Sequence, residues 1–520
     1  MACRKKFFFK LNSQSIYLVD KFNVLMDKSQ MKNKKLLISI FFILIISISF
    51  ITYSIYDDKR NNIPDSVEKI IPKPIKDFLI KNIFYKKKFE TRIKRLEQRI
   101  INKDKELKSE NKVVDKLLND LYLMGLDSLK FEKVRNKEKL TSKNGKNFVI
   151  TTFQTDYLSS NTWPHTRATA YIEKFDNNII LVSKDGVISY LDIKNLDKDN
   201  FETKIIKSNI REIISYDEWW SKPGGKGLKD VLVDEDKIYI SFMNLVDKDC
   251  YNTSILVAEI DFKQLEFQKF FEPPNCLKVR KGHNRWSDNS GGGRIFKYDD
   301  QNFLFSHGGF KTRVKSQDDK TVFGKIILIN KNSKDWSIIS KGHRNVQGLF
   351  YNKEKRFVIS TEHGPRGGDE ININDLKDER IKNFGWPISS YGEHYGPKEK
   401  NLANYEEAPL YKSHKDYGFD EPLKFFVPSI GISEIKIVPN KFDNTYLNDY
   451  FIGSMGNNIK EGDLSIHHIK LNNTNNKIIY HDIIAIDERV RDLMYLEELN
   501  KFLLFIENSA SLATLENTIN

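Results

Sequence analysis

The chain has 520 residues and a formal net charge of +13, and 39% of its residues are hydrophobic, which is enough to form a large folded core. The excess positive charge lies in one part of the chain, because residues 1–130 hold 28 Lys/Arg and 15 Asp/Glu, which leaves 56 of each for residues 131–520. Since the larger part of the chain is electrically balanced, we expect no basic groove and no nucleic-acid partner.

Residues 36–56, LLISIFFILIISISFITYSIY, form an uncharged apolar segment that is long enough to cross a bilayer as a helix. Three lysines precede this segment closely, and two aspartates follow it. Because positive residues stay on the cytoplasmic side, the pattern predicts a single-pass anchor, with residues 1–35 in the cytoplasm and the rest of the chain in the periplasm or another extracytoplasmic space. A cleaved signal peptide is the alternative, but no small-x-small cleavage site follows the segment.

Residues 57–84 include the proline-bearing run IPKPIKDF and are expected to be a linker. Residues 85–125 then repeat apolar positions at alternating steps of four and three, which is typical of the seam of a coiled coil and predicts a stalk that can self-associate. The apolar positions are Phe89, Ile93, Leu96, Ile100, Leu107, Val114, Leu117 and Leu121. The alternative is a single amphipathic helix that lies on the folded unit, and in either case the basic residues near the anchor would face anionic lipid headgroups.

Residues 145–520 consist of short β-rich runs such as NIILVSK, KIYISFM and KIILIN, separated by Asn, Asp, Lys and Gly. The runs fall into six groups that begin near residues 168, 226, 291, 345, 431 and 489, and this spacing of about 40–50 residues is that of propeller blades. We therefore predict an all-β fold, a six-bladed β-propeller, in which a strand at 147–153 closes the last blade from its N-terminal side. A β-sandwich is the alternative, but the repeats are too many for one.

Two of the three cysteines, Cys250 and Cys276, would be exported together with the propeller. In an oxidising compartment they could form a disulfide. Two free buried thiols are an equally open interpretation, because spacing alone does not decide between them.

One long segment resembles a known family. GHRNVQGLFYNKEKRFVISTEHGPRGGDEININ, followed by KNFGWPISSYGEHYG, is similar to the signature of the glucose/sorbosone dehydrogenase family, and the resemblance extends over roughly residues 165–515. Weaker similarities are GLKDVLVDEDKIYISF, GGGRIF, VPSIGIS and ERVRDL. The resemblance implies a six-bladed propeller, and the soluble glucose and aldose sugar dehydrogenases of this family use pyrroloquinoline quinone and calcium.

The resemblance implies a metal site in TEHGPRGGDEININ, residues 361–374. In the family, the carbonyl groups of the Gly-Pro pair face the calcium ion, and main-chain oxygens are ligands that this hard cation prefers. The two glycines that follow the pair, Gly367 and Gly368, are expected to take positive φ values that turn those carbonyl groups inward. The metal-site candidates are Gly364, Pro365, Asp369 and Glu370, of which the two acids would either bind the metal or rigidify the loop. A tight surface loop tied by its own acids is the alternative.

Arg344 and Asn345, in GHRN, match family residues that contact the quinone. An arginine at this point would polarise the carbonyl group that receives the hydride and would stabilise the negative charge that develops there. Arg489 and Arg491, in ERVRD, also match the family and would bind the acidic groups of a tricarboxylate cofactor. Ion pairs with nearby acids at the ends of blades are the alternative for all three arginines.

Two positions depart from the family. Where relatives carry the general-base histidine, four residues before the arginine of GGR, this chain has Ser290, whose hydroxyl cannot accept a proton near neutral pH as an imidazole does. His283 and Asp288, in the same segment, are the candidate replacements, although each is more often an ordinary loop residue. The second departure is Gly456, where relatives place a basic residue on a cofactor carboxylate.

These observations predict a membrane-anchored sugar dehydrogenase, in which Arg344 and calcium activate the quinone and His283 or Asp288 takes the hydroxyl proton of an aldose or related alcohol. The alternative is a non-catalytic propeller on a membrane stalk that binds a glycan or a protein, and Ser290 favours this alternative. A calcium-dependent hydrolase is a third interpretation, for which no specific motif is present.

Overall fold

The computed structural model describes Gln98 and residues 127–155, 169–214, 227–247, 250–278, 290–396, 398, 402–443, 448–457 and 462–518. The chain divides into two compact units, Met1–Glu106 and Leu107–Asn520, and every described residue except Gln98 belongs to the second. Apart from Gln98, the cytoplasmic segment 1–35, the anchor 36–56, the linker 57–84 and the stalk 85–125 therefore lie outside the described residues. Within the described part, no helix is both long and apolar enough to cross a membrane.

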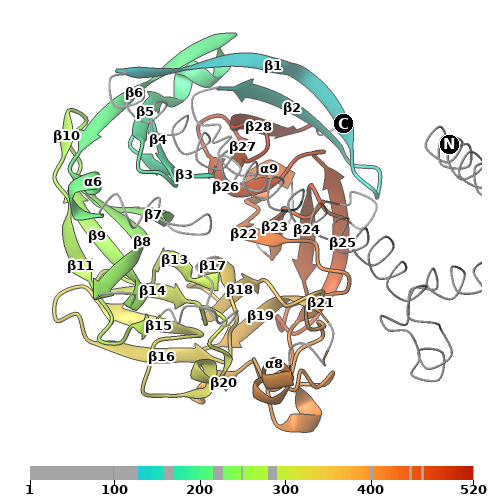
Figure 1. The fold of residues 1–520 in the computed structure, drawn as a ribbon. Coiled ribbons are helices and arrows are strands. Elements are labelled where there is room, and N and C mark those ends of the chain that lie inside the picture. Colours follow the sequence, from blue (N-terminus) through green and yellow to red (C-terminus); the bar gives the residue numbers. More distant parts are fainter. Residues whose placement is uncertain are drawn as a thin grey trace, which may run out of the picture. The chain divides into compact units, whose positions relative to one another are not determined.

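The second unit is a ring of antiparallel sheets, each of which begins with a strand close to the axis (Figure 1). The strands of six groups of four are β3 (Ala170–Phe175), β4 (Asn178–Ser183), β5 (Ile188–Asp192) and β6 (Asn200–Ser208); β7 (Leu228–Asp234), β8 (Lys237–Asp247), β9 (Cys250–Glu259) and β11 (Gln268–Phe271); β13 (Gly292–Lys297), β14 (Asn302–His307), β15 (Lys325–Asn330) and β16 (Trp336–Lys341); β17 (Val346–Asn352), β18 (Phe357–Glu362), β19 (Asp369–Asp375) and β21 (Lys424–Phe426); β22 (Ile432–Ile437), β23 (Asp449–Ser454), β24 (Ser465–Leu471) and β25 (Ile478–Ala485); and β26 (Val490–Leu496), β27 (Lys501–Ile506), β28 (Ser511–Asn517) and β2 (Asn147–Gln154).

The inner strands contact one another in chain order, from β3 to β7, β13, β17, β22 and β26, and β26 contacts β3 again, so the ring is closed. This is the all-β, propeller-like arrangement that the spacing of the strand runs predicts. The inner strands begin at residues 170, 228, 292, 346, 432 and 490, close to each predicted start. The agreement is close because each group starts after a turn segment rich in Gly, Asn, Asp or Ser, which marks the boundary in the sequence.

Closure of the ring uses two N-terminal strands rather than one. As predicted, β2 pairs with β28, from Phe148 opposite Asn517 to Gln154 opposite Ser511. In addition, β1 (Ser128–Thr141) pairs with β2 along one half and with β6 along the other, and so joins the first and last groups in a single ten-stranded sheet. The folded unit therefore begins before residue 145, the start expected from the sequence. The expected start was too late because the charged strand KFEKVRNKEKL carries little sign of β structure.

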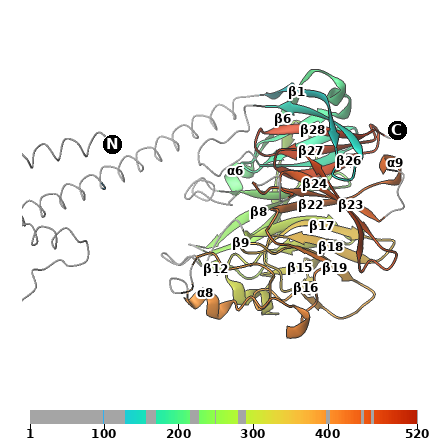
Figure 2. The same ribbon diagram turned by 90° about the vertical axis from the view of Figure 1, so that its right-hand side faces the viewer.

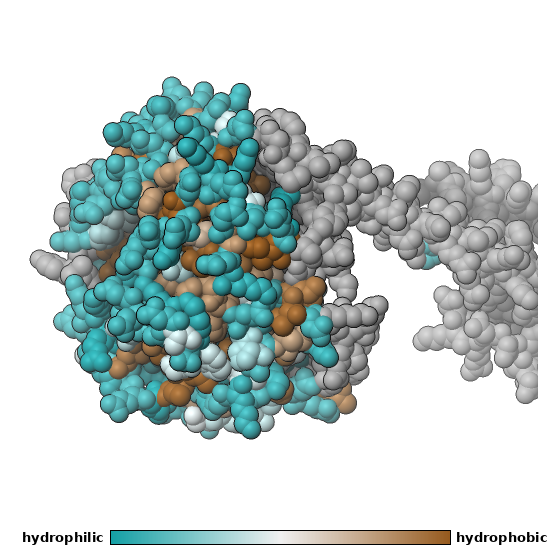
Figure 3. Space-filling view, turned by 90° about the vertical axis from the view of Figure 1, so that its left-hand side faces the viewer, coloured by the Kyte–Doolittle hydropathy of each residue, from teal (hydrophilic) through white to brown (hydrophobic). Residues whose placement is uncertain are grey.

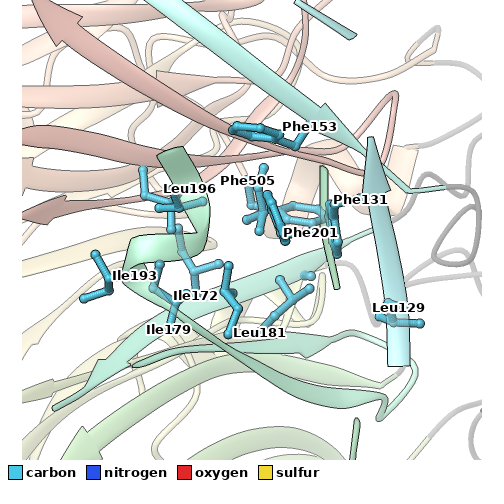
Figure 4. Packing of buried hydrophobic residues seen from close by; sticks show 14 of the residues in the cluster. Leu129, Phe131, Phe153, Ile172, Ile179, Leu181, Ile193, Leu196, Phe201 and Phe505 are labelled. Carbon is cyan, nitrogen blue, oxygen red and sulfur yellow. The ribbon is translucent and has the colours of Figure 1, made fainter. Parts of the chain in front are cut away.

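Neighbouring groups pack face to face, which explains why runs such as NIILVS in β4 are apolar on both faces. Figure 4 shows one such interface, in which Phe131 of β1, Phe153 of β2, Phe201 of β6 and Phe505 of β27 meet. A second buried cluster joins β3–β6 to β7–β9. The side of the ring that carries β10 and β11 is mostly hydrophilic outside (Figure 3), so the apolar residues are largely enclosed between sheets.

The axis of the ring contains charged side chains that come from the inner strands. Arg294 of β13 lies 2.8 Å from Asp230 of β7, 2.6 Å from Glu434 of β22 and 3.3 Å from Asp492 of β26. All four side chains are buried. Burial raises the pKa of Asp230 to about 7, although the guanidinium of Arg294 opposes this change. Arg294 thus links four of the six inner strands through polar contacts.

Cys250, at the start of β9, and Cys276 form a disulfide. Of the two interpretations that the sequence leaves open, the structure therefore contains the bonded pair. The residues after Cys276 form the short strand β12 (Leu277–Lys278), which pairs with Tyr251 and Cys250 of β9. The disulfide and β12 fix the start of the segment that leads to Ser290.

The remaining elements are short. They are the strands β10 (Gln264–Leu265) and β20 (Lys382–Asn383), the helices α6 (Ile210–Ile213), α8 (Leu402–Glu407) and α9 (Asn440–Asp443), and the 3-10 turns Ile193–Asp197, Arg313–Gln317 and Lys415–Tyr417. In side view, α6, β12 and α8 lie at one face of the ring, and α9 lies at the opposite face near the C-terminal end (Figure 2).

Candidate functional site

A pocket of about 280 Å³ lies where three inner strands begin. Its lining comes from the residues that precede β13, β17 and β22, from the loop between β18 and β19, and from two further loops that contribute Lys311 and Tyr395. The lining residues are Ser290, Lys311, Arg344, Asn345, His363, Gly364, Pro365, Asp369, Tyr395, Ser429 and Gly431. Five of the predicted site residues, from two separate motifs, therefore meet at one pocket: Arg344, Asn345, Gly364, Pro365 and Asp369.

The loop between β18 and β19 is held in shape by Asp369. One carboxylate oxygen of Asp369 accepts a hydrogen bond from the Gly364 N–H (3.1 Å), and the other accepts one from the Ile432 N–H at the start of β22 (3.0 Å). Because both oxygens bind main-chain donors, Asp369 serves to rigidify the loop, which is one of the two roles expected from the sequence.

Gly367 and Gly368 have φ values of +83° and +71°, which confirms the expected left-handed turn. A Cβ atom on Gly368 would lie 2.3 Å from the Gly392 nitrogen, so this glycine is also required by close packing. The backbone between Gly364 and Gly368 is thus fixed by conformation and by contact.

Gly364 and Pro365 line the pocket, and the carbonyl oxygen of neither residue accepts a hydrogen bond from a described residue. Carbonyl oxygens without a protein donor are suitable ligands for a hard cation such as calcium. No cluster of three or more His, Cys, Asp or Glu side chains suited to a metal occurs among the residues that the structure describes. A calcium site here would therefore rest on main-chain oxygens and on further ligands from the bound molecule or water.

Arg344 is held firmly at the pocket. Its guanidinium donates a hydrogen bond to the His363 carbonyl (2.8 Å) and lies over the ring of Trp386, with 5.6 Å between the guanidinium carbon and the ring centroid. Its backbone N–H donates to Glu362 (3.1 Å). Burial lowers the pKa of Arg344, but an arginine remains protonated at neutral pH. The pocket therefore contains one fixed positive charge beside the Gly-Pro loop.

Asn345 is fixed by neighbours on two strands. Its side-chain oxygen accepts hydrogen bonds from the Gly292 N–H and from the Gln347 amide, both at 3.2 Å. Its carbonyl accepts a hydrogen bond from the His363 N–H (3.0 Å). Asn345 thus joins the start of β13 to the Gly-Pro loop.

Glu370 does not line the pocket. Its carboxylate faces His414 (3.4 Å) and accepts a hydrogen bond from Asn372, which also donates to Glu362. Burial raises the pKa of Glu370 to about 7, while the hydrogen bond with His414 opposes this change. This buried group of two acids, a histidine and an amide lies behind the loop and supports it.

Arg489 and Arg491 do not line the pocket either, and both pair with the buried Glu507. Arg489 is 2.8 Å from one oxygen of Glu507, and Arg491 is 2.5 Å from the other. Burial raises the pKa of Glu507, but the two guanidinium groups outweigh burial and lower it to about 2. The two arginines and the glutamate together carry a net charge of +1. This charge is compatible with a purely structural ion pair and also with binding of an anion.

His283 and Asp288, the candidate proton acceptors, lie outside the described residues. Ser290 lies at the pocket, and its carbonyl accepts a hydrogen bond from the Phe310 N–H (3.0 Å). Ser290, at which the resemblance implies a histidine, is thus one of the residues that line the pocket.

Five further pocket residues were not predicted as site residues: Lys311, His363, Tyr395, Ser429 and Gly431. His363 precedes Gly364 directly, so its position in the motif was a signal that sequence analysis did not use. Its Nε2 is buried without a hydrogen-bond partner among the described residues, and burial lowers the pKa of the ring. Tyr395 lies in KNFGWPISSYGEHYG, and Ser429 and Gly431 lie in VPSIGIS, but none of them was singled out there. Lys311 comes from another loop, and no local motif marks it.

Close packing against Asp463 explains why residue 456 is a glycine. A Cβ atom at this position would lie 1.9 Å from a carboxylate oxygen of Asp463. A basic side chain, as found in relatives, would therefore need Asp463 to move. The space on this side holds an acidic group instead.

The sequence profile of the family described as Glucose / Sorbosone dehydrogenase matches residues 175–512. The chain belongs to the glucose/sorbosone dehydrogenase family. The match covers all six strand groups in whole or in part and confirms the resemblance found in GHRN and EHGPRGGDEIN.

Two curated relatives are each 29% identical to the chain over the residues that match. One is an uncharacterized protein of Synechocystis sp., matched over 204 residues, 39% of this chain and 45% of the relative. The other is the aldose sugar dehydrogenase YliI of Escherichia coli strain K12, matched over 194 residues, 33% of this chain and 49% of the relative. The matched region thus spans about half the length of each relative.

Solved structures of glucose/sorbosone dehydrogenase type show the same fold. A glucose dehydrogenase crystal structure is 20% identical, with a TM-score of 0.52 over 68% of this chain and 99% of that chain. The soluble aldose sugar dehydrogenase from Escherichia coli, in its apo-form, is 19% identical, with a TM-score of 0.52 over 74% of this chain and 99% of that chain.

Proposed function

We propose that the protein is a membrane-anchored oxidoreductase that oxidises a CH–OH group of an aldose or related alcohol, with pyrroloquinoline quinone held by calcium. The observation that carries this proposal is the meeting of Arg344, Asn345, Gly364 and Pro365 at one pocket. Membership of the glucose/sorbosone dehydrogenase family and the aldose sugar dehydrogenase relative support the same class of reaction.

The residues present fit this cofactor. The Gly364 and Pro365 carbonyl oxygens would ligate calcium, and Arg344 and Asn345 would contact the quinone. The Arg489–Arg491–Glu507 cluster keeps one net positive charge and would attract a cofactor carboxylate. When bound, the quinone would supply the acceptor for the hydride removed from the substrate carbon.

Arg344 would act through a fixed charge. Because its guanidinium is already held by the His363 carbonyl and the face of Trp386, little reorganisation is needed when negative charge develops on a ligand oxygen. Partial burial of the group strengthens this interaction, since less water screens it.

The substrate hydroxyl must lose a proton, and Ser290 cannot accept it near neutral pH. We assign this role to His283 or Asp288, from the segment that ends at Ser290. His363 would add a hydrogen bond to the bound sugar through its buried Nε2.

We place the propeller outside the cytoplasm, with segment 36–56 as a single-pass anchor and residues 1–35 in the cytoplasm. The Cys250–Cys276 disulfide supports an oxidising compartment, such as the periplasm. A membrane location would bring the site close to membrane electron carriers.

A second function, a non-catalytic module that binds a glycan or a protein, is favoured by one observation. Ser290 stands at the pocket in place of the histidine that relatives use. On this view, calcium would only shape the loop.

The two functions separate in one experiment. The purified protein is mixed with the quinone and calcium, and dye reduction is measured with several aldoses. Substrate-dependent reduction is expected, and failure to bind the quinone at micromolar concentration would reject the enzyme. If the quinone binds without turnover, Ser290→His is the next variant, and activity gained by this variant would show that only the base is missing.

A further inference from the structure

Lys311 occupies a position in the pocket that neither the family motifs nor the proposed function explains. We propose that Lys311 is a carboxylate-binding residue, which holds an acidic group of the molecule bound in this pocket. This inference rests on the proposed function only for the identity of the ligand, because the pocket and its charge are features of the fold itself.

The turn that carries Lys311 is tied to the residues of the pocket. The Gly309 N–H donates a hydrogen bond to the Arg344 carbonyl, and the Phe310 N–H donates one to the Ser290 carbonyl, both at 3.0 Å. Thr312 closes the turn by donating through its backbone and its hydroxyl to the Gly309 carbonyl, each at 2.7 Å. The backbone of Lys311 therefore cannot move away from Arg344 without breaking several hydrogen bonds.

The turn also adopts a conformation that is unfavourable for its residues. Phe310 and Lys311 have φ values of +49° and +65°, and two successive non-glycine residues in the left-handed region are costly. Phe310 is fully buried and packs against His307 and Phe323, with ring centroids 5.4 and 5.9 Å apart. The buried phenylalanine thus anchors the turn, and Lys311 is placed at the pocket by a strained backbone, as is common at binding sites.

The charge of the pocket points to an anionic ligand. Among the described lining residues, Lys311 and Arg344 are cationic, and Asp369 is the acid. Both oxygens of Asp369 accept hydrogen bonds from neutral main-chain groups, which leaves its charge in place, and two cations against this one acid give the described lining a net charge of +1. A lysine beside an arginine favours a carboxylate over a neutral hydroxyl group, because a charge-assisted hydrogen bond is about twice as strong as a neutral one.

Two ligands of the proposed enzyme would present such a carboxylate. One is the tricarboxylate quinone, and the other is an acidic sugar such as a uronic acid. The chemistry at Lys311 is the same for both, and binding measurements on the two ligands distinguish them.

The experiment uses the full-length protein in detergent, with calcium, and measures equilibrium binding by fluorescence. The variants are Lys311→Gln, which removes the charge at similar size, and Lys311→Arg, which keeps it. The matched control is Lys320→Gln, since Lys320 is an exposed lysine on the same segment that does not line the pocket. The ligands are pyrroloquinoline quinone, its trimethyl ester, glucuronate and glucose.

If the carboxylate belongs to the cofactor, Lys311→Gln weakens binding of the quinone about tenfold or more, and Lys311→Arg restores most of it. Lys311→Gln does not change binding of the trimethyl ester, and the control Lys320→Gln does not change binding of the quinone. If the carboxylate belongs to the substrate, quinone binding is unchanged, and Lys311→Gln abolishes a preference for glucuronate over glucose.

The inference is overturned if Lys311→Gln changes neither quinone binding nor the discrimination between glucuronate and glucose. A wild-type protein that binds no quinone would reject the proposed enzyme, and the sugar measurements would still decide the role of Lys311. In that case, a wild-type protein without a preference for glucuronate would overturn the inference as well.

Discussion

The Gly-Pro loop shows how single residues shape the pocket. Gly368 combines a left-handed backbone with a close approach to Gly392, whereas Gly418 has a similar φ of +79° and no heavy atom within 4 Å of the point that a Cβ atom would occupy. The two glycines therefore differ in packing and share a conformation, which makes Gly418 a matched control.

Gly418→Ala is expected to cost about 1–2 kcal/mol in the free energy of unfolding, because alanine is disfavoured in the left-handed region. Gly368→Ala is expected to cost more and to weaken calcium-dependent binding of the quinone, since the added methyl group displaces the loop. Denaturant unfolding and binding titrations measure both effects. Equal stability losses in the two variants, with binding retained, would show that the contact with Gly392 is unimportant.

Glu507 is a second residue whose environment makes a definite prediction. Its pKa in the folded protein is about 2, below the ordinary value of 4.5, because Arg489 and Arg491 outweigh the effect of burial. A lowered acid pKa stabilises the fold above pH 4.5, and this contribution is lost as the pH falls towards 2.

Glu507→Gln is therefore expected to lower the free energy of unfolding by about 3 kcal/mol at pH 7. The difference from wild type should shrink steadily between about pH 5 and pH 2. Denaturant unfolding across this range measures it. A difference that stays constant down to pH 2 would mean that the carboxylate charge does not stabilise the fold.

The pocket residues that were predicted all lie in family motifs, although His363 and Tyr395 lie in the same motifs and were missed. Arg344 and Asn345 directly precede the inner strand β17, and the Gly-Pro loop joins β18 to β19 of the same strand group, so these residues meet at one pocket. Lys311 was missed because its place depends on a turn held by Ser290 and Arg344, which are distant in sequence. Glu370 is next to Asp369, but alternation along β19 points its side chain away from the pocket.

At the scale of elements, the Cys250–Cys276 disulfide and the β9–β12 pairing control the start of the segment that leads to Ser290. The bond closes a loop with a sequence separation of 26 residues. Such a link restricts the unfolded chain, and in the folded protein it holds Cys276 against β9.

Replacing both cysteines, by Cys250→Ser and Cys276→Ser together, is expected to lower the free energy of unfolding by about 3 kcal/mol. Cys3→Ser is the control, since it leaves the disulfide intact. Thermal and denaturant unfolding under oxidising conditions provide the measurement. If the double variant matches wild type, the bond does not contribute to stability.

The strand β1 shows what the pattern of strand runs could not provide. Its sequence, SLKFEKVRNKEKLT, alternates poorly and is rich in charge, because most of the strand lies at an outer position with half of its side chains in solvent. Its place is fixed by pairing with β2, the next strand along the chain, and with β6, which lies much farther along the chain at Asn200–Ser208. Non-local pairing of this kind leaves little local signal.

At the scale of the whole molecule, the ring is held together at its axis by Arg294 as well as by apolar contacts between sheets. The guanidinium of Arg294 forms ion pairs with three buried carboxylates, each from a different strand group. Each acid also accepts a main-chain hydrogen bond, and Lys436 lies 3.7 Å from Glu434. Removing the guanidinium would nevertheless leave three buried carboxylates without the cation that joins them, which is costly even where the intact pair contributes little. Arg294, in the GGR motif, thus contributes strongly to the electrostatic balance at the centre of the ring.

Arg294→Met is expected to lower the free energy of unfolding by about 3–5 kcal/mol. Arg380→Met is the control, because Arg380 pairs with Asp420 but is 57% exposed, and its loss is expected to cost less than about 1 kcal/mol. Denaturant unfolding of both variants gives the comparison. Similar small losses at the two sites would contradict a central role for Arg294.

The six strand groups and their order could be predicted because short β-rich runs recur at a regular spacing and are separated in the sequence by Gly, Asn, Asp and Ser. Ring closure through two N-terminal strands, and the charged axis, could be predicted only in part, since both depend on contacts between distant segments. The family signature supplied the site, and the fold explains why these motifs converge there.

The central claim is that the carbonyl oxygens of Gly364 and Pro365 hold a calcium ion at the pocket. Crystals grown with calcium and the quinone, measured for anomalous scattering from calcium, test it most directly. The account predicts a calcium peak about 2.3–2.6 Å from both oxygens, on the same side of the loop as Arg344. A structure in which both carbonyl groups face bulk solvent, or in which calcium binds elsewhere, would contradict it.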